Sequence, residues 1–231
     1  MKTLGIIGGM SWESTSVYYQ LLNQGVRDRL GGLYSAKILL NSVEFNEIVE
    51  LQHQGNWQRA ALILSQAAQS LEKAGADGLL IASNTMHKIA DEVTADVSIP
   101  LLHIADSTAR AIACKGYQQV GLLATAFTME QDFYKGHIQS HYGIEVMVPD
   151  ECGRAVIHNV IYDQLCQGIV DDESRIAYLR IIESMRERGA QAVILGCTEI
   201  DLLISQADTQ MPLFDSTALH VADAVDWMLN D

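Results

Sequence analysis

Two short segments place reactive side chains directly after apolar runs that predict buried strands. Cys197 follows the run that ends at Leu195 and one glycine, and Ser83 follows the run 78–82. A thiol at a strand end, beside a helix N-terminus, can have a lowered pKa and act as a base or nucleophile. Free cysteines are more often inert core residues, so position alone leaves both interpretations of Cys197 open.

The residues next to these two side chains are polar and small. The segment Ser83–His87 offers side-chain and backbone donors that suit a carboxylate ligand, although N-capping of a helix accounts for the same residue types. In the second segment Thr198 and Glu199 occupy the places of Asn84 and Thr85. Glu199 could bind an ammonium group, or it could be a solvated carboxylate favoured by a helix dipole.

The two segments belong to an internal repeat. Residues 73–85 align with residues 187–199 without a gap, at an offset of 114 that superimposes Ser83 on Cys197. The start of the chain aligns with the region from residue 121, and the segments after Pro100 and Pro212 also correspond. Ordered matches at a nearly constant offset favour duplication over the ordinary likeness of two βαβ units.

The repeat predicts two similar α/β lobes, each with a short, mainly parallel sheet flanked by helices. Ligands of open α/β sheets bind beyond the carboxyl ends of the strands. If the lobes face each other, Ser83 and Cys197 meet across one cleft from opposite sides. That arrangement suits removal of a proton from one face of a carbon and its return to the other.

The elements that position these residues follow from apolar patterning and glycine or proline boundaries. We expect a strand at 3–8 that ends at a glycine turn, and a good helix at 57–74 that Gly75 terminates. The other expected strands are 36–43, 78–82 and 101–104, and the other expected helices are 11–29 and 87–95.

Composition narrows the classes of function. The chain has 231 residues, of which 48% are hydrophobic and 19% charged, and its formal net charge is −14. These values fit a globular protein with a sizeable core and do not fit disorder. The negative field repels phosphate backbones, so no nucleic-acid partner is expected. No apolar run approaches the roughly 18 residues of a membrane span.

Cofactor and metal motifs are weak or missing. The segment Gly5–Met10 lacks the G-x-G-x-x-G spacing, and Asn41-Ser42 stands where an acidic residue would follow the second strand, so NAD binding is not expected. No lysine has a pyridoxal-phosphate context. Neither the seven histidines nor the four cysteines are expected to form a metal site. The cysteines form no C-x-x-C pair, which predicts reduced thiols in a cytoplasmic protein.

Three motifs together resemble one family. Gly8-Gly-Met-Ser-Trp-Glu-Ser-Thr15, Ser83-Asn-Thr-Met-His87 and Gly196-Cys-Thr-Glu-Ile200 are similar to the aspartate/glutamate racemases, which work without a cofactor. The resemblance covers essentially the whole chain and is strongest to the broad-spectrum and L-aspartate/glutamate-type racemases of enteric bacteria. It implies two-base racemisation, in which Cys197 exchanges a proton with one face of the substrate Cα.

The chain departs from the family at one catalytic position. Members usually have C-N-T where this chain has Ser83-Asn84-Thr85, and some relatives have Thr there. A natural hydroxyl and an engineered Cys→Ser change are both compatible with the sequence. A serine hydroxyl needs an adjacent general base, so we expect slow or one-directional turnover. The resemblance further implies that Cys197 faces the proton of the L enantiomer.

The resemblance also assigns the substrate contacts and the assembly. It implies a homodimer that binds a small amino acid or dicarboxylate, with a first lobe of residues 1–102 plus 210–231 and a second of 103–209. A non-catalytic dicarboxylate binder, and a decarboxylase or maleate isomerase of the same fold, remain alternatives. The implied substrate-binding residues are Met10 (by its backbone), Gln52, Asn84, Thr85, Thr125, Thr198 and Glu199.

Overall fold

A computed structural model describes residues 1–230, which form two compact units. One unit contains Met1–His103 and the chain from His220 onward, and the other contains Ile104–Leu219. Each unit has one four-stranded parallel sheet. The α/β class and the two similar lobes expected from the sequence are therefore confirmed. No helix among residues 1–230 combines the length and the apolar character that a membrane crossing requires.

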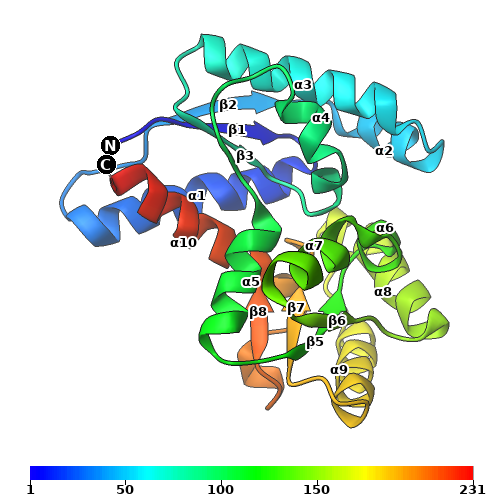
Figure 1. The fold of residues 1–231 in the computed structure, drawn as a ribbon. Coiled ribbons are helices and arrows are strands. Elements are labelled where there is room, and N and C mark those ends of the chain that lie inside the picture. Colours follow the sequence, from blue (N-terminus) through cyan, green and yellow to red (C-terminus); the bar gives the residue numbers. More distant parts are fainter. Residues whose placement is uncertain (231) are drawn as a thin grey trace. The chain divides into compact units, whose positions relative to one another are not determined.

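The sheet of the first unit has the strand order β2-β1-β3-β4. Helices cover both of its faces, and Figure 1 shows α3 on one face with α1 and α10 on the other. Its strands are β1 (Leu4–Gly8), β2 (Ile38–Ser42), β3 (Gly78–Ile81) and β4 (Leu101–Leu102); its helices are α1 (Trp12–Leu30), α2 (Phe45–His53), α3 (Trp57–Lys73), the 3₁₀ turn η1 (Thr85–Ile89), α4 (Ala90–Thr94) and most of α10 (Ser216–Leu229).

Side chains of the central strands point alternately to the two faces of the sheet, and this explains why helices cover both faces. Ile6 and Leu80 pack with α1 and α10, whereas Ile7, Leu79 and Ile81 pack with α3. Successive side chains of a strand point to opposite faces. A strand buried on both faces therefore reads as a continuous apolar run, as parallel sheets usually do.

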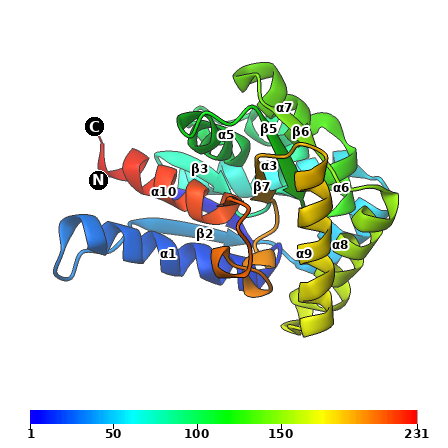
Figure 2. The same cartoon turned by 90° about the horizontal axis from the view of Figure 1, so that it is seen from below.

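The second unit repeats this plan with the strand order β6-β5-β7-β8. Helix α5 packs against α7, and α8 packs against α9; Figure 2 shows α8 and α9 side by side. Its elements are α5 (Ile104–Cys114), β5 (Gln119–Leu123), α6 (Ala126–Glu130), α7 (Asp132–Tyr142), β6 (Glu145–Met147), α8 (Glu151–Asp163), η2 (Leu165–Gln167), α9 (Asp172–Glu187), β7 (Ala192–Leu195), η3 (Ile200–Leu202), η4 (Gln206–Asp208) and β8 (Leu213–Asp215).

Backbone hydrogen bonds match between the two sheets. In the first unit Ala82 N donates to Ile7 O at 3.0 Å, and in the second Gly196 N donates to Leu123 O at 2.7 Å. Each bond joins the residue before the proposed catalytic side chain to the neighbouring central strand. The repeat read from the sequence therefore extends to the backbone around both proposed catalytic positions.

Three expectations about the elements need correction. The strand expected at 101–104 is only Leu101–Leu102, because Ile104 already begins α5. Helix α2 was not expected; the Glu44 side chain caps it by accepting from two backbone N–H groups. Residues 210–219 belong to the second unit rather than the first, because β8 pairs in parallel with β7.

Candidate functional site

The glycine-rich segment after β1 builds a tight loop at the carboxyl edge of the first sheet. Gly9 N donates to Thr15 Oγ1 at 2.8 Å, and Thr15 Oγ1 donates to Ser11 O at 2.8 Å. Ser11 also caps α1 by accepting from Ser14 N at 3.2 Å. Gly9 has a φ of +87°, and a Cβ there would lie 2.2 Å from Val43 O. Only glycine fits this conformation and this close backbone approach.

Ser83 lies in the loop that follows β3. It is partly buried, and its Oγ accepts a 3.4 Å hydrogen bond from Met86 N. The carbonyl of Ser83 accepts from His87 Nδ1 at 2.7 Å, so that nitrogen carries a proton. Within residues 1–230 no side-chain nitrogen hydrogen-bonds the Ser83 hydroxyl. The hydroxyl therefore has no adjacent base of the kind that activates a serine.

The expected substrate-binding residues of the first unit cluster around this loop. Asn84, Thr85 and Gln52 are buried, with exposed fractions of 5%, 6% and 5%. Gln52 Nε2 donates to Met86 Sδ at 3.0 Å, and this hydrogen bond connects the C-terminal end of α2 to the segment that follows Ser83. Met10 and Met86 belong to one apolar cluster. Polar groups this well buried at a strand edge are either satisfied internally or turned toward a ligand.

Cys197 lies in the matching loop after β7, in the second unit. Gly196 allows the loop to pack closely, since a Cβ there would lie 3.1 Å from the Ala124 side chain. The Cys197 thiol is partly buried and donates to Glu199 Oε2 at 3.0 Å. Thr198 Oγ1 donates to the same carboxylate oxygen at 2.6 Å. Glu199 is 6% exposed, so this carboxylate interacts with the thiol away from bulk water.

The pKa of the Cys197 thiol lies well above its usual value, and the expected lowering is not found. Burial is the largest cause, followed by the negative charge of Glu199 and then by Cys166. The expected helix N-terminus is also missing, because the loop leads into the three-residue turn η3. A short 3₁₀ turn has few aligned peptide dipoles to stabilise a thiolate. At neutral pH the Cys197 side chain is therefore a thiol hydrogen-bonded to a carboxylate.

Thr125 and Thr198 contribute hydroxyls to the second unit. Thr125 is the residue before α6, is 7% exposed, and its Oγ1 lies 3.2 Å from Thr128 Oγ1. Ala124, the residue before Thr125, lies close to Gly196, the residue before Cys197. Thr125, Thr198, Glu199 and the thiol therefore belong to one edge of the second sheet.

Several side chains near Cys197 were not anticipated. The pKa of Asp201 is raised to about 6 by desolvation and by the charges of Asp215 and Glu199. Desolvation also raises the pKa of Asp215 and that of Tyr162, and the Cys197 charge adds to the shift of Tyr162. Sequence reasoning missed Asp201 and Asp215 because exposed acids are common in so acidic a chain.

Two side chains of the second unit, Asp106 and His137, belong to a group that could hold a metal ion. His137 Nε2 lies 2.7 Å from Asp106 Oδ1, and the rings of His137 and His141 stack with centroids 4.3 Å apart. Imidazole and carboxylate are common metal ligands. The sequence reasoning predicted no metal site and overlooked the H-x-x-x-H spacing of His137 and His141, but His141 is not among the side chains that could share an ion. None of these residues is among those expected to bind substrate.

The whole chain is similar to proteins of one family. Residues 7–224 match the family model "Asp/Glu/Hydantoin racemase". A candidate Asp/Glu racemase from Yersinia pestis is 51% identical over the whole of both chains, with a TM-score of 0.94. An aspartate racemase homologue from Pyrococcus horikoshii is 34% identical, again over both whole chains, with a TM-score of 0.87. The broad-specificity amino-acid racemase RacX of Bacillus subtilis is 24% identical over 93% of each chain.

Proposed function

The chain belongs to the Asp/Glu/hydantoin racemase family, and from that premise we propose that it racemises aspartate, glutamate or a broader set of amino acids without a cofactor. Two solved structures that match this chain over the full length of both chains support this proposal. The observation that carries the proposal is the hydrogen bond from the Cys197 thiol to the buried Glu199 carboxylate. It gives the thiol proton a defined acceptor at a strand end where substrates of α/β folds bind.

Cys197 is the proposed acid and base for one face of the substrate Cα. As a base, its thiolate takes the Cα proton, and the electron pair passes into the substrate α-carboxylate. Glu199 is placed to accept the thiol proton before this step, because its Oε2 lies 3.0 Å from Sγ. As an acid, the protonated thiol returns a proton to the carbanion. The raised pKa of Cys197 favours the thiol form that this second role needs.

Ser83 is the proposed partner on the other face. It occupies the position in the first unit that matches Cys197 in the second, and its hydroxyl accepts a hydrogen bond from Met86 N. The hydroxyl can deliver a proton to the carbanion, after which water must reprotonate the alkoxide. It is a poor base for the reverse step. We therefore propose slow turnover that favours the direction beginning at Cys197, with the L enantiomer as its substrate.

The remaining residues are proposed to bind the substrate and to stabilise the charge that develops on its carboxylate. Asn84 and Thr85 would supply donors from the first unit, and Thr125 and Thr198 from the second. Donors arranged in advance around a developing charge are usually a large part of catalysis. Glu199 would attract the ammonium group of the substrate. Asp201 lies close enough for the Glu199 charge to raise its pKa, and it would add to this attraction. Gln52 and the backbone of Met10 are proposed as further contacts.

A cytoplasmic homodimer is the proposed state of the protein. All four cysteines are free thiols, which is usual in a reducing compartment. Sedimentation equilibrium would distinguish a dimer from a monomer of 25.4 kDa.

Loss of the Cα–H signal in D₂O tests the proposed activity directly. Aspartate and glutamate of either configuration are incubated with the protein and followed by proton NMR. Wild type should exchange the Cα proton of at least one enantiomer, and Cys197→Ala should abolish this exchange. Cys114→Ala, at an exposed thiol, serves as the control and should retain it. If wild type binds these amino acids but exchanges none of them, the protein is the alternative, a non-catalytic binder.

A further inference from the structure

A cavity of about 280 Å³ lies in the second unit and is lined mainly by residues of the helices α8 and α9. Its apolar lining includes Val156, Ala177 and Ile181, and the exposed Cys152 also lines it. Ligand cavities commonly range from roughly 300 to 1,000 Å³, and this one, just below that range, suits only a small ligand. It contains none of the residues proposed for racemisation.

Two arginines give the cavity a positive charge. Arg180 and Arg188 both line it, and neither forms an ion pair with any residue in 1–230. Arg188 Nη1 donates to Val148 O at 3.1 Å, which fixes that guanidinium at the cavity. These two arginines thus carry positive charge that no carboxylate pairs, in a chain with a net charge of −14.

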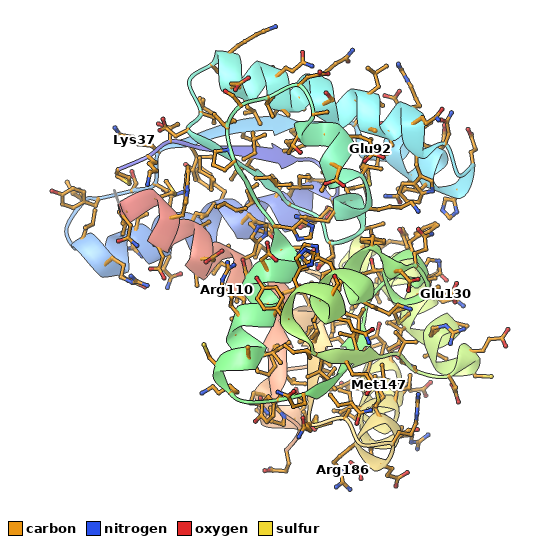
Figure 3. All side chains as sticks on the ribbon, in the orientation of Figure 1. Lys37, Glu92, Arg110, Glu130, Met147 and Arg186 are labelled. Atoms are coloured by element: carbon orange, nitrogen blue, oxygen red, sulfur yellow. The ribbon has the colours of Figure 1, made fainter. Side chains whose placement is uncertain are left out.

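The one carboxylate that lines the cavity is already engaged. Asp150 caps α8, and its Oδ1 accepts from Gly153 N at 2.8 Å. The other exposed arginine on this part of α9, Arg186, pairs with Glu183 and does not line the cavity; Figure 3 labels it at the end of the helix. The unpaired cations are therefore specific to the cavity rather than typical of the helix.

We propose that this cavity is a second ligand site, which binds a small carboxylate with an apolar body. The carboxylate lies against Arg180 and Arg188, because guanidinium groups bind carboxylates through paired, charge-assisted hydrogen bonds. The apolar body covers Val156 and Ile181. The nature of the lining selects a monocarboxylate with an aliphatic chain over the short, doubly charged substrates of the proposed racemase.

The thiol of Cys152 provides the measurement, because a bound ligand blocks it. Hexanoate is the probe, with hexanamide and hexylamine as neutral and cationic controls of the same length. Alkylation of Cys152 by iodoacetamide is followed by mass spectrometry of its peptide, and the exposed Cys114 in the same sample reports any general effect. Hexanoate should slow Cys152 alkylation saturably and leave Cys114 unchanged, while hexanamide and hexylamine should give little protection.

Matched variants identify the charges responsible. Arg180→Gln should weaken hexanoate protection about tenfold, as loss of one charge-assisted hydrogen bond predicts. Arg186→Gln removes an equally exposed arginine from the same helix outside the cavity and should leave protection unchanged. Equal protection by hexanamide, equal slowing of Cys114, or full protection in Arg180→Gln would each overturn the proposal. The outcome is independent of racemase activity, which the D₂O exchange measures separately.

Discussion

At the scale of single residues, the contact between Cys197 and Glu199 governs the proposed chemistry. A buried carboxylate 3.0 Å from a thiol disfavours the thiolate by its charge and at the same time offers an acceptor for the proton. The sequence identified both residues but not their contact. It assigned Glu199 to a substrate ammonium group, because residues two positions apart after a strand have no fixed mutual orientation. Only the turn that follows Gly196 brings the two side chains together.

Replacing Glu199 by Gln tests this coupling. The Glu199 charge raises the pKa of Cys197, so its removal should lower that pKa. Alkylation of the Cys197 peptide by iodoacetamide, measured against pH, should then rise at lower pH in the variant. Glu183→Gln, at an exposed carboxylate on α9, should leave the profile in place. An unshifted profile in Glu199→Gln would show that burial alone raises the pKa.

Replacing Ser83 by Cys tests the proposed two-base scheme. A thiol with a reference pKa of about 8.5 is a far better acid and base near neutral pH than a hydroxyl. Well-placed acid–base groups contribute roughly 10²–10⁴-fold, so racemisation should rise measurably, most of all from the D enantiomer. Initial rates from both enantiomers of aspartate and glutamate are read by circular dichroism. Rates that stay level or fall in both directions would remove residue 83 from the mechanism, and Ser83→Ala supplies the baseline without a hydroxyl.

At the scale of elements, helices and strands with strong apolar periodicity were predicted well and their ends less well. Helix α3 was expected at 57–74 and is found at Trp57–Lys73, because an apolar stripe and Gly75 define it. Gly75 and Gly189 have φ angles of +96° and +104°, and each terminates the corresponding helix of its unit. Helix α2 was missed because its start depends on the Glu44 side-chain cap rather than on a Ser, Thr, Asp or Asn.

Two glycine substitutions separate backbone strain from steric collision at the element ends. Gly75→Ala places a side chain at positive φ with nothing within 4 Å, and should lower the free energy of unfolding by about 1–2 kcal/mol. Gly9→Ala adds a collision with Val43 O at 2.2 Å, and should cost more than about 3 kcal/mol. Urea unfolding of both variants supplies the comparison. Equal losses would mean that the loop after β1 relaxes without cost.

At the scale of the whole molecule, the repeat was visible in the sequence but the division of the chain was not. Matching motifs at a constant offset predicted two similar sheets, and both are found. The boundary near residue 210 failed because β8 stays with the second sheet while α10, from His220 onward, packs with the first unit. An amphipathic helix shows which face it buries but not which sheet receives it. That choice depends on contacts between residues far apart in the chain.

His220 makes those distant contacts, and its loss should destabilise the first unit. The side chain is fully buried, its Nε2 donates to Leu102 O at 2.8 Å, and its Nδ1 accepts from Tyr18 OH at 3.0 Å. It thereby joins α10 to β4 and to α1. His220→Ala removes both hydrogen bonds and leaves a cavity, so the free energy of unfolding should fall by about 2–4 kcal/mol.

The control for His220→Ala lies on the same helix. Asp226→Ala removes an exposed ion pair with Arg29, and should cost less than about 1 kcal/mol because water screens such pairs. Urea unfolding followed by far-ultraviolet circular dichroism measures both variants. Hydrogen exchange then locates the effect: faster exchange in α1 and β4 with α9 unchanged would show that His220 holds the C-terminal helix to the first unit. Equal losses in the two variants, or uniform exchange throughout, would show that apolar packing of α10 holds it without the histidine.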